Sequence, residues 1–164
     1  ALMGDTAVLA PAGAGAQDGK EILLKDQYSK VDGPGRHRGE AMLLIYGKVD
    51  GMGRMERWED RIRKEIPGTL VILRGLDARS ARGQKTETEV NERLQLNVPP
   101  EISLLIDWNG DLVRAYRLPD ADVSVTIVDA KGHGCRSIAG PVNKETFEEM
   151  RALFVQVRKA GACP

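Results

Sequence analysis

The sequence has no excess of charge of either sign and no long apolar run. Lysine and arginine together number 24, and aspartate and glutamate also number 24, so no net field favours nucleic acid or an anionic membrane as a partner. No apolar run approaches the roughly 18 to 20 residues of a membrane span, and no glycine-rich phosphate loop of the required spacing precedes a helix. These absences predict a protein without a nucleic-acid partner or a membrane span.

The N-terminal region is also unlike an uncleaved signal peptide, because it lacks a basic segment followed by an apolar one. We therefore expect either a cytosolic chain or an exported chain whose signal has been removed. Residues 1–19 are rich in Ala and Gly without an amphipathic period, which predicts a flexible arm. The rest of the chain, 20–164, is long enough to bury a sizeable core and predicts one domain.

The first half of that domain alternates strand and helix signals. The runs at 42–46 (MLLIY) and 69–73 (TLVIL) are short, apolar and bounded by Gly or Pro, as buried strands are. Between them, apolar residues recur at steps of three and four, which predicts one buried helical stripe ending before Pro67. That stripe consists of Met52, Met55, Trp58, Ile62 and Ile66. Strand, helix and strand with short connections predict a right-handed parallel βαβ unit.

The second half adds a hairpin and a terminal helix. Residues 123–140 contain two strand-like runs around an Asp-Ala-Lys-Gly turn. Asn143 is a helix cap, and the helix after it has the buried stripe Phe147, Met150, Phe154 and Val157. A capping-box pattern at 86–89 opens a shorter helix, and 102–107 reads as a strand. The segment 112–118 fits a short helix or an irregular strand equally well.

A basic stretch follows the second predicted strand. It carries four cations against Asp77 alone: Arg74, Arg79, Arg82 and Lys85. Ligands of open α/β sheets tend to bind at this edge, so the stretch is a candidate contact for an anion or a partner. A loop whose charges simply face water is the competing interpretation.

Three phrases carry a family resemblance: KDQYSKVDGPGRHRGEAMLLIYG, LLIDWNGDLVRAYRLPD and TIVDAKGHGCRSIAGPV. With the order of elements, they resemble the thioredoxin-like fold of the periplasmic redoxin type, and most closely its YtfJ-type branch of small exported proteins. The resemblance implies a three-layer α/β/α fold, with a central mixed sheet and a C-terminal β-hairpin plus helix. It also implies a periplasmic or otherwise exported location.

The chain departs from this family at its chemical centre. Redox-active relatives place Cys-x-x-Cys where the first strand meets the first helix, because a helix N-terminus lowers the pKa of a thiol. Here that position is Asp50, Gly51, Met52 and Gly53, or in the other frame Met52, Gly53, Arg54 and Met55. The cis-proline of the family aligns with Val123, and Pro119 lies too far upstream to replace it. Dithiol exchange by the ordinary route is therefore not expected.

The two cysteines, Cys135 and Cys163, lie on the second hairpin strand and just after the last helix. In this fold the last helix packs antiparallel across that strand, so the resemblance implies that the two residues meet. We predict a disulfide that pins the C-terminal tail and stabilises the fold by about 3 kcal/mol. Two unpaired thiols are the alternative. A disulfide would favour an oxidising compartment.

The leading functional prediction is a non-catalytic, redox-inactive, exported protein that acts as a partner-binding or assembly subunit. Its contact surface would be the degenerate active-site loop and the basic stretch, its partner another protein or a larger complex, and it would need no cofactor.

Two alternatives stay open. The first is a copper-handling protein that uses Met52 and Met55, with His133 and Cys135 as further soft or borderline ligands, since some members of the fold are copper chaperones. Core packing explains the two methionines without a metal. The second is a single-cysteine thiol enzyme that uses Cys135, although nothing around a strand cysteine is expected to lower its pKa.

Overall fold

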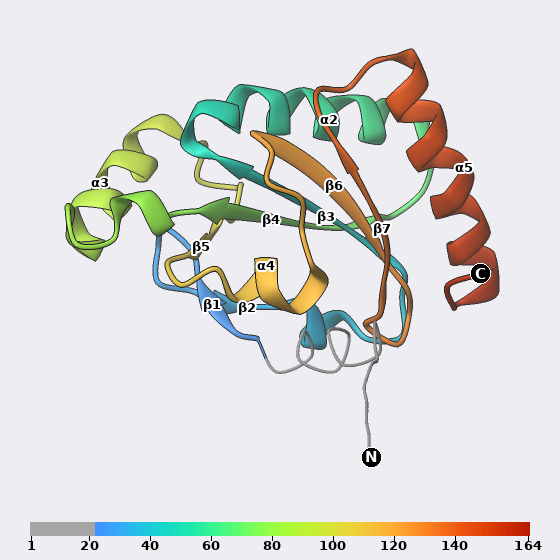
Figure 1. Cartoon of the computed structure of the whole chain (residues 1–164), viewed down its shortest axis with the longest axis horizontal. Coiled ribbons are helices and arrows are strands. Elements are labelled where there is room, and N and C mark those ends of the chain that lie inside the picture. Colours follow the sequence, from blue (N-terminus) through green and yellow to red (C-terminus); the bar gives the residue numbers. More distant parts are fainter. Residues whose placement is uncertain (1–21) are drawn as a thin grey trace.

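The protein is built on one five-stranded sheet. The computed structural model describes residues 22–164 (Figure 1), so the predicted flexible arm at 1–19 lies outside the described residues. The strands run in the spatial order β5-β4-β3-β6-β7. Their bounds are β3 Met42–Lys48, β4 Val71–Asp77, β5 Leu105–Asp107, β6 Val123–Val128 and β7 Gly134–Ala139.

The sheet is mixed, as the sequence predicted. β3, β4 and β5 run parallel to one another, whereas β6 pairs antiparallel with β3 and β7 antiparallel with β6. β4 is longer than expected and shifted, since it begins at Val71 and continues to Asp77. Its second half pairs with β3 on one side and β5 on the other, so hydrogen bonding extends the strand into the basic stretch. Arg74 consequently lies within a strand and not in a loop.

Helices cover both faces of this sheet, giving the three layers seen in Figure 1. On one face lie α2 (Met52–Glu65) and α5 (Lys144–Ala160), with α3 (Glu87–Asn97) packed into the same core. The other face is covered by α4 (Asp111–Tyr116) and the small antiparallel pair β1 (Leu24–Lys25) and β2 (Val31–Asp32). Within residues 22–164, three short 3₁₀ turns lie at Pro34–His37, Val49–Gly51 and Arg79–Ala81.

The larger core lies between the sheet and α2 and α5. Trp58, Ile62, Phe147 and Phe154 are all 0% exposed there, which confirms both predicted helical stripes. The indole N–H of Trp58 donates a 2.9 Å hydrogen bond to the carbonyl of Gly140, which ties α2 to the segment after β7. A buried Trp N–H needs such a partner, so this bond fixes the position of the helix as well as filling volume.

The structure contains the two helix caps that the sequence predicted. The Thr86 side chain and the Glu89 side chain form the reciprocal capping box that opens α3, and Asn143 caps α5 together with Thr146. The undecided segment at 112–118 is helical as far as Tyr116, where α4 ends, and the carboxylate of Asp107 accepts the first free N–H groups of this helix. In residues 22–164 no helix combines the length and apolarity needed to cross a membrane.

Candidate functional site

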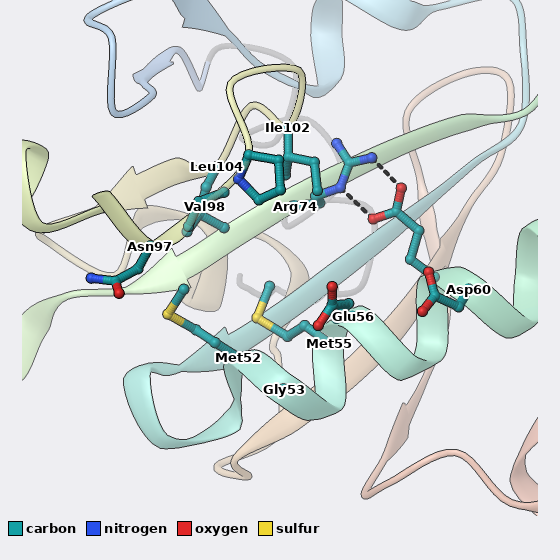
Figure 2. A pocket seen from close by; sticks show the side chains of 12 residues that line it. Met52, Gly53, Met55, Glu56, Asp60, Arg74, Asn97, Val98, Ile102 and Leu104 are labelled. Atoms are coloured by element: carbon teal, nitrogen blue, oxygen red, sulfur yellow. Dashed lines mark hydrogen bonds and ion pairs between the residues drawn. The ribbon is translucent and has the colours of Figure 1, made fainter. Parts of the chain in front are cut away.

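The N-terminus of α2 opens onto a pocket. The 3₁₀ turn Val49–Gly51 leads directly into the helix, so Met52 is its first residue. The pocket, with a volume of about 300 Å³, lies between α2 and the segment before β5, and Figure 2 shows its lining. Its wall is largely apolar, with carboxylates from the outer turns of α2. The side chains that face it are Met52, Met55, Glu56, Glu59, Asp60, Arg74, Asn97, Val98, Pro99, Ile102 and Leu104.

The two methionines point into this pocket from adjacent turns (Figure 2). Met55 is only 6% exposed and belongs to the core, whereas Met52 is half-buried. His133 lies in the hairpin turn just before β7, at the end of the sheet opposite the two methionines. The structure therefore does not bring it to them. The copper interpretation stays a prediction, and core packing accounts for Met55.

The loop at the start of α2 packs tightly against the residue before β6. A Cβ atom added at Gly51 would lie 2.0 Å from the carbonyl oxygen of Asp122. Arg54 pairs with the same aspartate across 3.6 Å, Asp50 lies in the 3₁₀ turn Val49–Gly51, and Gly53 is the second residue of α2. Val123 is fully buried as the first residue of β6, and the peptide bonds of residues 22–164 are all trans. The alignment of Val123 with a cis-proline stays a prediction.

The four cations of the basic stretch do not form one cluster. Arg74 is only 16% exposed and makes a two-pronged ion pair with Glu59 of α2, which Arg63 also contacts. Burial raises the pKa of the Glu59 carboxyl, but hydrogen bonds from the two arginines outweigh it, so its pKa is lowered. Arg79 pairs with Asp77 at 2.7 Å. Arg82 and Lys85 remain exposed.

A buried polar cluster at the carboxyl ends of the parallel strands was not predicted. The Tyr46 hydroxyl donates to the carboxylate of Asp107 at 2.9 Å, and Asp77 with Arg79 lies beside this pair. Burial raises the pKa of both Tyr46 and Asp107. Because Asp107 also accepts two backbone N–H groups of α4, its buried carboxylate has three hydrogen-bond donors, and the cluster is part of the framework.

The two cysteines form the predicted disulfide. The Cys135 and Cys163 sulfurs are 2.03 Å apart and their Cα atoms 5.4 Å apart, and both residues are half-buried. The disulfide lies at the end of the sheet opposite α2's N-terminus, because Gly134 pairs with Val128, which in turn pairs with Met42 at the start of β3. The chain's only two thiols therefore meet far from the position at which this architecture usually carries them.

A buried carboxylate lies beside this disulfide. Asp129, the residue after β6, is 2% exposed, and one of its oxygens lies within 4.8 Å of both sulfurs. Its Oδ1 accepts the N–H groups of Lys131 and His133 at 2.9 Å, and its Oδ2 accepts the N–H of Cys163 at 3.1 Å. The His133 carbonyl lies 3.8 Å from both sulfurs. The hairpin turn thus contacts both sulfurs of the disulfide.

Sequence reasoning identified Asp129 only as part of a tight turn. The signal for its second role was present, since the turn precedes Cys135 by a few residues. The sequence did not show that the C-terminal tail packs against this turn. Gly161 ends α5 in a left-handed conformation, and its carbonyl accepts the N–H of Ala130 at 3.3 Å. This contact returns Cys163 to the turn.

The mixed sheet with helices on both faces, ending in a hairpin and a helix, defines a thioredoxin-like α/β fold. Among solved structures it matches the pneumococcal exposed lipoprotein thioredoxin of Streptococcus pneumoniae, with a TM-score of 0.62 and 16% identity over 79% of this chain and 96% of that one. It also matches dsbF of MTB in mixed oxidized and reduced forms, with a TM-score of 0.58 and 11% identity over 94% and 100% of the two chains.

A third match is a thiol:disulfide interchange protein, DsbE, of Chlorobium tepidum, with a TM-score of 0.54 and 11% identity over 83% and 92% of the chains. No family model and no curated protein sequence matches the chain. These similarities establish the fold.

The leading functional prediction is wrong. A non-catalytic, partner-binding subunit was inferred from the loss of Cys-x-x-Cys, but structures named as thioredoxins and thiol:disulfide interchange proteins match this one. The chain also has a disulfide of its own, between Cys135 and Cys163. The prediction failed because it took the missing Cys-x-x-Cys and cis-proline as the loss of all redox chemistry, and it treated the predicted Cys135–Cys163 disulfide only as a staple of the C-terminal tail.

Proposed function

We propose that this protein carries out thiol–disulfide exchange with Cys135 and Cys163 as its redox couple. The observation that carries the proposal is a half-buried disulfide with the buried carboxylate of Asp129 within 4.8 Å of both sulfurs. A carboxylate at that distance can exchange a proton with a sulfur through one water when the sulfur changes between thiol and thiolate. The single-cysteine alternative is thereby extended to a cysteine pair.

The exchange takes place in two steps. A thiolate of a partner protein attacks one sulfur, the S–S bond breaks, a mixed disulfide forms, and the released thiolate takes a proton. The partner's second thiol then attacks the mixed disulfide. The partner leaves oxidised as a disulfide, and this chain keeps two thiols with the two protons that the partner lost.

Cys163 is the residue that forms the mixed disulfide in this proposal. It lies on the tail after α5, so it can move without breaking sheet hydrogen bonds, whereas Cys135 is held within β7. Cys135 is then the thiolate released in the first step, and it acts as the resolving thiol when the exchange runs in the reverse direction. With no thiol in the loop 50–55, the α2 N-terminus takes no part in this chemistry.

The substrate class is a dithiol-bearing protein, and the compartment is an oxidising one outside the cytosol, where disulfides persist. An exported member of the YtfJ-type branch of thioredoxin-like proteins fits both features. The resemblance of the three sequence phrases and the presence of the disulfide support this placement.

The reduction potential tests the proposal. The protein is equilibrated with graded dithiothreitol redox buffers, and the fraction of reduced Cys135–Cys163 is counted by alkylation and mass spectrometry. We expect a potential above about −300 mV, because structural disulfides of secreted proteins lie below that value. A lower potential would show that the disulfide is a permanent staple.

The roles of the two cysteines are tested by trapping. Reduced Cys135→Ser should form a stable mixed disulfide with an oxidised model peptide through Cys163. Cys163→Ser should trap the peptide more slowly through the strand residue. Faster trapping by Cys163→Ser would reverse the assignment.

A further inference from the structure

The residues around the disulfide also form a set of metal-ligating atoms. A carboxylate oxygen of Asp129 and the sulfurs of Cys135 and Cys163 all lie within 4.8 Å of one another. The imidazole of His133 lies next to this group, with Nδ1 3.5 Å from Oδ2 of Asp129, and rotation of its side chain would bring it in as a fourth donor. Two sulfurs, one carboxylate and one imidazole are the donor types that Zn²⁺ binds in four-coordinate sites.

The fold holds these donors in place through backbone contacts. Three N–H groups, from Lys131, His133 and Cys163, donate to the buried Asp129 carboxylate and fix its orientation. Oδ1 accepts two of these bonds and Oδ2 one, so Oδ2 keeps a lone pair, because a carboxylate accepts about four hydrogen bonds. The segment that carries Cys163 is tied to the turn by the Ala130 N–H, which donates to Gly161. The carboxylate and the two sulfurs thus come from three places in the chain and are brought together before any metal binds, with His133 beside them.

We propose that the reduced protein binds one Zn²⁺ through the sulfurs of Cys135 and Cys163, the carboxylate of Asp129 and Nδ1 of His133. Reduction by an external dithiol supplies two electrons and two protons to the disulfide, and the metal then displaces the two thiol protons. The Cα–Cα distance of 5.4 Å allows the two sulfurs to separate by side-chain rotation and bind one ion. The donor set combines soft and hard atoms, which suits Zn²⁺ better than Cu(I).

Metal binding and the disulfide exclude each other, because the same two sulfurs serve both. Oxidation of the pair therefore releases the ion, and bound Zn²⁺ protects the thiols from exchange. This inference uses the cysteine pair of the proposed function and rests on it only in requiring that the disulfide be reducible.

The test uses the full chain reduced with a phosphine under anaerobic conditions, with Co²⁺ as a spectroscopic probe and Zn²⁺ titrated against a chromophoric chelator. We expect one equivalent of Co²⁺ to give thiolate-to-cobalt charge-transfer absorption, and Zn²⁺ to displace it. The oxidised protein should bind neither ion. Circular dichroism of the reduced apo-protein shows whether the fold persists when the disulfide is open.

The chain offers a matched control, because its two histidines lie in different places. His133→Ala should weaken Zn²⁺ binding about tenfold or more, whereas His37→Ala should leave it unchanged, since His37 pairs with Asp32 near the start of the domain. Each cysteine-to-serine variant should lose the charge-transfer band.

Reduced protein that binds no Zn²⁺ at micromolar concentration overturns the inference, and so does an affinity that His133→Ala leaves unaltered. Because no partner protein enters this titration, failure of thiol exchange and failure of metal binding are separate outcomes. A potential above −300 mV with no zinc binding leaves the proposed function standing and removes the metal site.

Discussion

Opening the Cys135–Cys163 disulfide should destabilise the protein by an amount that depends on the length of the loop between the two cysteines. The two residues are 28 positions apart, and closing a loop of that length removes entropy from the unfolded chain worth about 3.5 kcal/mol at 25 °C. For a domain of this size each kcal/mol corresponds to roughly 2 to 4 °C in Tm. We therefore expect reduction to lower Tm by about 7 to 14 °C.

The same free energy appears in the redox equilibrium. Because the disulfide stabilises the folded state, folding makes the disulfide harder to reduce by an equal amount, as a thermodynamic cycle requires. With two electrons transferred, about 3.5 kcal/mol corresponds to about 75 mV. The potential of the folded protein should lie about that far below the potential measured for the same chain in denaturant.

Urea unfolding of the oxidised and reduced protein measures the first quantity, and dithiothreitol equilibration with and without denaturant measures the second. The variant Cys135→Ala with Cys163→Ala serves as the control, because its stability should not respond to reductant. A change below 1 kcal/mol on reduction, or two measurements that differ by more than 1 kcal/mol, would refute the loop-closure reasoning.

Two further predictions concern the α2 side of the molecule. Glu59→Gln removes the carboxylate that pairs with Arg74 and should cost about 1.5 to 3 kcal/mol at neutral pH, measured by urea unfolding. Because the pKa of Glu59 is lowered in the folded state, its stabilisation is complete above the ordinary carboxyl pKa and is lost as the pH falls through the lowered value, so variant and wild type should converge in acid. Glu148→Gln, on an exposed pair, should show little change at any pH, and an equal loss in both variants would contradict the assigned burial effect. Gly51→Ala should destabilise by about 1 to 3 kcal/mol, since its Cβ would lie 2.0 Å from a carbonyl oxygen. Gly53→Ala, whose Cβ would make only an ordinary contact with the Arg57 side chain at 3.9 Å, should be neutral or stabilising. Urea unfolding of both variants measures this, and a destabilised Gly53→Ala would point to helix disruption instead of the clash.

Much of the fold was predictable because its signals are local. The stripe through Trp58 and Ile62 and the capping box from Thr86 to Glu89 each depend on residues a few positions apart. Side-chain spacing and backbone hydrogen bonding at that range act the same way in any context. The hairpin at 123–140 was readable for the same reason.

The less accurate predictions involve contacts that are distant in sequence. β4 continues through Arg74 because β3 and β5 supply hydrogen-bond partners on both sides. The helix at 111–116 forms where Asp107, at the end of a strand, accepts its first N–H groups. Propensity alone does not decide such segments, since a partner elsewhere in the fold satisfies their polar groups.

For the candidate site, the sequence by itself determined that the α2 N-terminus carries Met52 and Met55 instead of thiols, since the strand and helix that define the position are local features. With the family resemblance it also predicted that Cys135 and Cys163 pair. Only the tertiary structure decided what surrounds that pair, because Asp129 meets Cys163 across a sequence separation of 34 positions. A buried carboxylate beside two sulfurs depends on where β6, β7 and the end of α5 pack, and that packing is a property of the whole core.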